Sequence, residues 1–116
     1  MDTQSDAVKA TQSYFDDCIQ KILDISKSDY PAEINGMHGR LVIKIDILPD
    51  GQLRSASLTQ STGYKRLDDA IVKFVHSASP FKPLPEDILK TTDVLTIRST
   101  FVFTPENSLK GFYSPQ

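Results

Sequence analysis

Between Gly39 and Gln60, hydrophobic and polar residues alternate with a period of two, which predicts extended strands. The apolar face of the first half is mostly β-branched, as a half-buried strand favours, and carries Leu41, Ile43, Ile45 and Ile47. Pro49-Asp50-Gly51 then supplies a turn, since proline fixes φ and glycine accepts positive φ. The return strand breaks strict alternation and predicts either a β-bulge or an early twist, with apolar residues at Leu53, Ala56 and Leu58. The segment is expected to form a β-hairpin that the remaining apolar segments cover.

Two segments have helical periodicity instead. Residues 7–25 place an apolar stripe at helical spacing, and Tyr30-Pro31 is expected to end this helix. Residues 67–78 form the clearest helical pattern, with Leu67, Ala70, Ile71, Phe74, Val75 and Ala78 on one face. Short helical turns are expected at 32–34 and 86–88, the second after a rigid, proline-rich crossover at 81–85.

A third strand is predicted from Val94 to Thr104, because β-branched and aromatic residues alternate there with polar ones until Pro105. These elements predict an α+β fold: an antiparallel three-stranded sheet with helices packed on one face, in the order α-β-β-α-β. The return strand of the hairpin would form one edge and the third strand the other. A long hydrophobic strand at an edge is either an aggregation hazard or a docking site for another chain.

The domain organisation follows from the same pattern. Residues 1–6 are expected to be disordered and residues 105–116 to form a polar C-terminal tail. Residues 7–104 are expected to form a single domain, with an N-terminal helix at 7–25 and a core at 30–104.

Composition narrows the class of function. The 116 residues carry a net charge of −2, which argues against nucleic acid and against a polybasic membrane patch. The sequence shows neither a bilayer-spanning apolar run nor a signal peptide, so we expect a cytoplasmic protein or a fragment of a protein anchored elsewhere. The single cysteine, Cys18, excludes an internal disulfide and lies on the apolar stripe, where it is expected to be a small buried hydrophobe.

The residues offer little catalytic chemistry. His38 and His76 stand at no metal-ligand spacing, and Asp68-Asp69 diverge around a helix and indicate a charged helix start. Phosphate-loop and nucleophile-elbow motifs are absent, so we expect no enzyme, metal or cofactor. Arg98 is unusual within the third strand and indicates either an outward charge that discourages aggregation or a contact to a bound peptide.

An ordered series of short motifs resembles the C-terminal domain of TonB, the energy transducer of Gram-negative bacteria. The series runs from Tyr30 to Thr104 and comprises Tyr30-Pro31, Gly39 to Ile47, Pro49-Asp50-Gly51, Gln60 to Tyr64, Leu67 to Ala70, Pro80 to Ile88, Thr92 to Leu95 and Phe101 to Phe103. The order of the pieces makes the series fairly specific.

The resemblance implies a periplasmic domain whose full-length relatives carry an inner-membrane anchor and a proline-rich spacer. It implies that the domain grips the TonB box of outer-membrane transporters and transmits force powered through ExbB and ExbD. In the family the box adds as a strand to the edge of the last strand, which here gives a predicted partner site at Val94, Leu95, Thr96, Ile97, Arg98, Ser99, Thr100, Phe101 and Val102. A disordered peptide must lose entropy on binding, so micromolar affinity, on the order of −8 kcal/mol, is expected.

The chain departs from the family in two places. The Gln-Pro-Ala motif of some members has only Tyr30-Pro31-Ala32 as a counterpart, and its role is not transferred. The tail after Pro105 is longer than the family pattern requires and could form a fourth strand that covers the edge or acts as a displaceable guard. Two other interpretations stay open: a homodimeric scaffold with paired or exchanged third strands, and a TolA-like envelope interaction domain.

Overall fold

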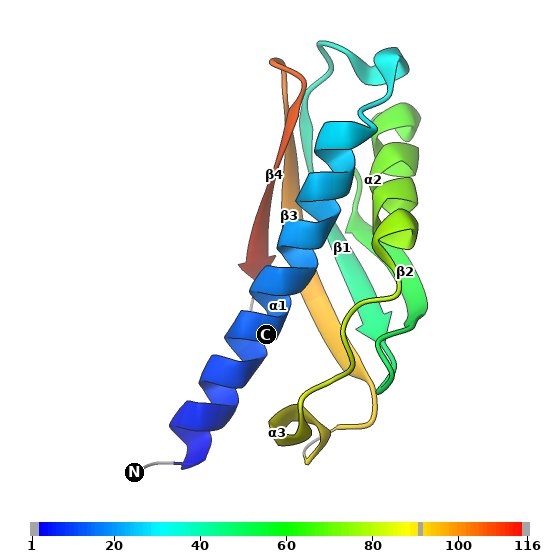
Figure 1. Ribbon diagram of the computed structural model, residues 1–116. Coiled ribbons are helices and arrows are strands. Elements are labelled where there is room, and N and C mark those ends of the chain that lie inside the picture. The colour runs from blue at the N-terminus through cyan, green and yellow to red at the C-terminus, as the bar shows by residue number, and fades with distance from the viewer. Residues whose placement is uncertain (1–2, 91, 115–116) are drawn as a thin grey trace.

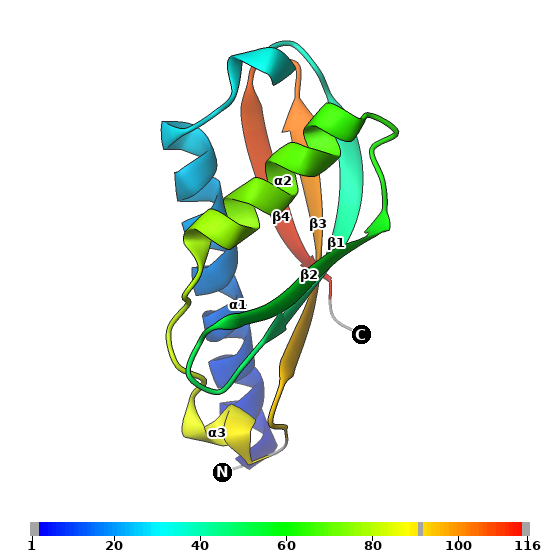
Figure 2. The ribbon, with the colours of Figure 1, turned by 90° about the vertical axis from the view of Figure 1, so that its right-hand side faces the viewer.

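The computed structural model describes residues 3–90 and 92–114, and these form an α+β fold. In chain order the elements are α1 (Thr3–Ser28), the 3-10 turn η1 (Ala32–Ile34), β1 (Gly39–Ile47), β2 (Leu53–Gln60), α2 (Lys65–Ala78), α3 (Glu86–Leu89), β3 (Leu95–Thr104) and β4 (Ser108–Ser114). The strands make one antiparallel sheet in the order β2-β1-β3-β4. Helices α1 and α2 lie on one face of this sheet, and the described residues place no helix on the other face (Figures 1 and 2).

The described sheet has four strands, so the expectation of three strands with the last one at an edge is wrong. The predicted tail turns back after Thr104, and the backbone N–H of Asn107 donates to the carbonyl oxygen of Thr104 at 3.1 Å. Asn107 takes a left-handed φ of 63°, a conformation that asparagine tolerates better than most residues. Leu109 follows this turn and is buried in the structure, so the tail contributes to the core as well as to the sheet.

Helix α1 is longer than predicted. It begins at Thr3 and ends at Ser28, so residues 3–6 are helical rather than disordered, while Met1 and Asp2 lie outside the described residues. The apolar stripe predicts only the part of a helix that contacts a core, and here the helix extends past that part at both ends. At its C-terminal end the helix continues until a residue that cannot be helical follows. That stop is Pro31, preceded by Ser26 and Ser28, whose hydroxyls donate back to carbonyl oxygens of the last turns.

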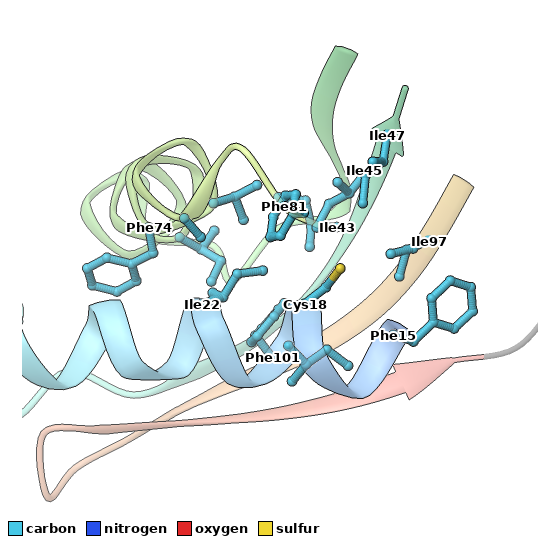
Figure 3. Close-up of a cluster of buried hydrophobic side chains, with 14 of the residues drawn as sticks. Phe15, Cys18, Ile22, Ile43, Ile45, Ile47, Phe74, Phe81, Ile97 and Phe101 are labelled. Atoms are coloured by element: carbon cyan, nitrogen blue, oxygen red, sulfur yellow. The ribbon is translucent and has the colours of Figure 1, made fainter. Parts of the chain in front are cut away.

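The alternating face of β1 forms the floor of the core, as predicted. Its four inward residues are at most 2% exposed. Side chains from α1 and α2 close over them, and those of β3 pack beside them in the same sheet. Figure 3 shows this cluster between the helices and the sheet. Its largest fully buried members are Phe74, Phe101, Phe103, Ile22, Ile34, Leu41, Ile43, Ile45, Ile47, Leu67, Ile71 and Ile97.

The β1–β2 ladder is irregular, which agrees with the bulge among the two predicted alternatives. The register shifts between Val42 and Ile43 and again between Asp46 and Ile47. The predicted edge position of β2 is also confirmed, because the described residues place only β1 beside it.

The hairpin turn is fixed against the crossover that follows α2. The backbone N–H of Phe81 donates to the carbonyl oxygen of Gly51 at 2.8 Å, and that of Leu84 donates to Pro49 at 2.9 Å. From the other side the Tyr14 hydroxyl donates to the carbonyl oxygen of Lys82 at 2.6 Å. The proline-rich crossover therefore joins the hairpin to α1.

Candidate functional site

The predicted partner site divides into three parts in the structure. Val94 precedes β3, which begins at Leu95. Leu95, Thr96 and Ile97 pair with β1 on one side and, within the described residues, with no strand on the other. From Arg98 to Val102 the strand is paired on both sides, since β4 runs along it from Arg98↔Ser114 to Thr104↔Ser108. Most of the predicted edge is therefore covered.

Strand β4 is held by packing as well as by its ladder. Leu109 lies opposite Phe103 and is 8% exposed. Gly111 lies opposite Phe101, where a Cβ atom would stand 2.8 Å from both the Phe101 ring and the Ile19 side chain. Contacts between α1 and β4 are thus close enough that only glycine fits at this position without a shift.

The side chains of β3 contribute to a partner site only on the outer face of the sheet. Leu95, Ile97, Ser99 and Phe101 face the helices and are buried. Thr96 and Arg98 are exposed and Val102 is half-buried. A strand added beside β3 would consequently be recognised mainly through main-chain hydrogen bonds.

The outer face also gathers positive charge that the net charge of the chain conceals. Arg40, Arg98 and Lys110 are exposed there and Lys44 is half-buried, while Asp46 is the only acidic residue on the four strands. The Asp46 carboxylate accepts hydrogen bonds from Ser55 at 3.0 Å and from Thr96 at 2.7 Å. The sequence pattern drew attention to Arg98 alone. Arg40 and Lys44 could have been found from the alternation that identified the core, because they fall on the face of β1 opposite its buried side chains.

A small pocket lies between α1 and the crossover, with a volume of about 170 Å³. Its lining includes Cys18, which is 4% exposed, as predicted for a buried hydrophobe. Burial raises the pKa of the Cys18 thiol to about 12, so the nucleophilic thiolate is scarce at neutral pH. Burial also raises the pKa of the neighbouring Tyr14 hydroxyl. His38 and His76 are exposed and are not among the residues that line this pocket.

Asp68 organises the loop before α2. Its carboxylate accepts a short hydrogen bond from the Ser61 hydroxyl, and two more from the Thr62 backbone N–H at 3.0 Å and the Thr62 hydroxyl at 2.8 Å. Burial by itself raises the pKa of Asp68, but these hydrogen bonds outweigh it and hold the pKa below its ordinary value. The residue is therefore more than the charged helix start that the sequence suggested.

Asp68→Ala is expected to lower the free energy of unfolding by about 1–2 kcal/mol at pH 7, because three donors lose their acceptor. A carboxylate whose folded pKa is depressed stabilises the protein above its unfolded pKa, and this contribution is lost as the pH falls through the folded pKa. Urea unfolding at pH 7 and at about pH 2.5 should show a smaller difference from wild type at the lower pH. Asp69→Ala is the control, because the described residues donate no such set of hydrogen bonds to its carboxylate. Equal losses in the two variants, or a loss independent of pH, would contradict this role.

The described residues contain neither a cluster of metal-binding side chains nor a membrane-spanning helix. Those residues hold no group of three or more His, Cys, Asp or Glu side chains arranged to bind a metal ion. None of the helices in the described part of the chain is long and apolar enough to cross a membrane.

The comparisons with known proteins agree with the motif series. The family model described as "Gram-negative bacterial TonB protein C-terminal" matches residues 26–105, which is more than half of the chain. The search of curated proteins and the search of solved structures returned no match. The matched region includes β1 to β3, the crossover and Asp68, and stops before β4. This chain belongs to the TonB C-terminal domain family, whose members are non-enzymatic interaction domains of energy transducers.

Proposed function

We propose that this domain binds the TonB box of an outer-membrane transporter by adding it as a strand beside β3. Membership of the TonB C-terminal family supports this function. In the proposal the domain works in the periplasm and passes force to the transporter. The force comes from ExbB and ExbD through an inner-membrane anchor on the full-length protein.

The observation that carries the proposal is the uneven cover of β3. Within the described residues Leu95 to Ile97 have no strand on this side, so an incoming strand can begin to pair there, and β4 occupies the edge from Arg98 onward. A partner strand that starts on the open part replaces β4 one residue at a time. Each main-chain hydrogen bond lost to β4 is replaced by one to the partner, so the exchange is nearly neutral in hydrogen bonds.

The other edge of the sheet suits this role less well. Strand β2 contains two register shifts and exposes polar side chains at Arg54, Ser55 and Ser57. Short, irregular and charged strands are the features by which proteins discourage pairing at an edge. A regular edge is needed for a ladder of several hydrogen bonds.

The position of β3 also suits a load. Its pairing with β1 extends from Gly39↔Phe103 to Ile47↔Leu95, and its inward side chains lie in the core. When a partner strand is pulled along β3, the main-chain hydrogen bonds between the two strands lie perpendicular to the force and share the load. A partner on the outer edge of β4 would instead load the shorter ladder between Arg98↔Ser114 and Thr104↔Ser108.

A set of fluorescent TonB-box peptides tests strand addition. Proline at a central position removes a main-chain donor, and we expect two such replacements to weaken binding about tenfold or more in fluorescence anisotropy. Exchanges among Val, Thr and Ile at the same positions should change affinity by less than about threefold, because they preserve the strand.

The control peptide carries its two prolines beyond the ends of the paired segment and should bind like the original. A peptide series in which central prolines are tolerated while side-chain exchanges abolish binding would overturn the proposal, since that pattern describes a side-chain pocket.

A further inference from the structure

The four strands carry a net positive charge, whereas the rest of the chain is net negative. They carry five basic residues and one acidic residue, Asp46. Because the whole chain has a net charge of −2, the helices and loops together carry −6 against +4 on the strands. The sheet therefore presents a positive outer face, turned away from α1 and α2 (Figure 2), on a protein that is negative elsewhere.

The register arranges four of these cations in two rows. Lys44 lies directly opposite Arg98, while Arg40 and Lys110 both lie opposite Val102, one on each side of β3. With strands about 4.8 Å apart and residues about 3.4 Å apart along a strand, the four Cα positions span roughly 10 by 13 Å. Between the rows on β1 and β3 lie Val42, which is half-buried, and Thr100, which is buried.

None of the four cations has an ion pair within the described residues, where the salt bridges are Lys82–Asp17 and Lys90–Asp87. Asp46 is engaged by Ser55 and Thr96 instead. Like charges directly opposite each other on a sheet destabilise it, so the Lys44–Arg98 pair costs the fold free energy. A partner that supplies carboxylates at this face would remove that cost.

We propose that the outer face of the sheet, formed by Arg40, Lys44, Arg98 and Lys110, docks a carboxylate-bearing surface of a partner protein. The proposal goes beyond strand addition, since it concerns side chains on the face rather than main chain at an edge. It applies to the domain with β4 in place, because Lys110 lies on that strand.

Charge and shape together favour a protein over an extended polyanion. The cations frame a less polar strip, and interfaces between proteins combine such strips with a polar rim. A membrane surface or a nucleic acid is larger than a patch of roughly 10 by 13 Å and would also meet the net negative charge of the remaining molecule. A compact acidic patch on a partner would interact mainly with these cations, because the negative charges elsewhere on the domain are screened beyond about 8 Å at physiological salt.

The probe is a helical, alanine-rich peptide that presents six glutamates on one side. A helix pairs its own backbone N–H and C=O groups and cannot add as a strand, so the probe reports on the face alone. Glutamates spaced four and eight residues apart lie about 6 and 12 Å apart along the helix, which matches the spacing of the cations. The control peptide has the same sequence with glutamine in place of each glutamate.

In a two-dimensional NMR titration at about 50 mM salt, we expect shifts at Arg40, Lys44, Arg98 and Lys110. The glutamate peptide should bind about tenfold or more tightly than the glutamine peptide. Lys44→Glu combined with Arg98→Glu should weaken binding by at least about tenfold, whereas Lys65→Glu with Arg66→Glu on α2 should change it less than about twofold.

The single variant Lys44→Glu keeps the test informative if the double variant unfolds. It converts the like-charge pair with Arg98 into a pair of opposite charge, so its thermal midpoint should not fall while peptide binding weakens several-fold. Equal binding of the two peptides, or shifts confined to other surfaces, would overturn the proposal. Tighter binding to phosphatidylglycerol vesicles or to a DNA duplex than to the peptide at about 150 mM salt would overturn it as well.

Discussion

Gly111→Val is expected to destabilise the domain and, at the same time, to strengthen its binding to a TonB-box peptide. A Cβ atom at this position would stand 2.8 Å from Ile19 and from Phe101, so the valine forces β4 away from α1 and β3. Overpacking of this kind lowers the free energy of unfolding by about 1–3 kcal/mol. Valine is a better strand former than glycine, so the loss cannot come from intrinsic propensity.

Binding should improve because the partner no longer has to displace a well-packed β4. If β4 docking is weakened by about 2 kcal/mol, the apparent affinity can rise by up to about 30-fold. Urea unfolding gives the first quantity and fluorescence anisotropy the second.

Ile71→Ala is the control for general destabilisation. It removes a fully buried side chain from α2 and should cost about 2–5 kcal/mol without strengthening peptide binding. A Gly111→Val protein that is destabilised but binds with unchanged affinity would show that β4 does not occupy the partner's position.

Gly51→Ala is expected to lower the free energy of unfolding by about 3 kcal/mol or more. Gly51 has a φ of +92°, and a Cβ atom there would lie 2.1 Å from the Phe81 carbonyl oxygen. The alanine must therefore break the contact between the hairpin turn and the crossover, including the Phe81 N–H bond to Gly51. For a domain of this size the thermal midpoint should fall by roughly 10 °C.

Gly63→Ala separates crowding from backbone strain. Gly63 has a similar φ of +89° but nothing within 4 Å of its Cβ position, so only the strain of the left-handed backbone, about 1 kcal/mol, is expected. Similar losses at the two glycines would mean that the crossover is not rigidly docked on the turn.

The hairpin and α2 were predictable because their patterns are local. Each buries one face, and the period of the apolar residues identifies both the element and the face, as Ile43, Ile45 and Phe74 confirm. The bulge in the return strand was visible for the same reason, since Leu53 and Ala56 break the alternation.

Strand β4 could not be assigned from its own residues. Its stability depends on pairing with β3 and on packing between Gly111 and Ile19, which lies near the other end of the chain. A single glycine and one buried leucine give no periodic signal, although the sequence did allow a fourth strand. The unpaired part of β3 at Leu95 to Ile97 is defined by where β4 ends, so it could not be predicted without β4.

The positive face was hidden for a related reason. Arg40, Arg98 and Lys110 come from three strands, and only the register brings them together. Net charge is a sum over the chain and carries no information on how charges are placed. The partners of Asp68 were close in sequence, but the loop at Ser61 and Thr62 had to fold back before its role was apparent.

The proposed strand addition at β3 is tested most directly by an amide NMR titration of the wild-type domain with a TonB-box peptide, with light scattering to establish the mass. We predict that the largest shifts begin at Leu95 to Ile97 and extend along β3, and that the amides of β4 lose their protection from solvent exchange. The β2 amides from Leu53 to Gln60 should stay unchanged. Shifts concentrated on β2, with β4 still protected, would contradict strand addition at β3.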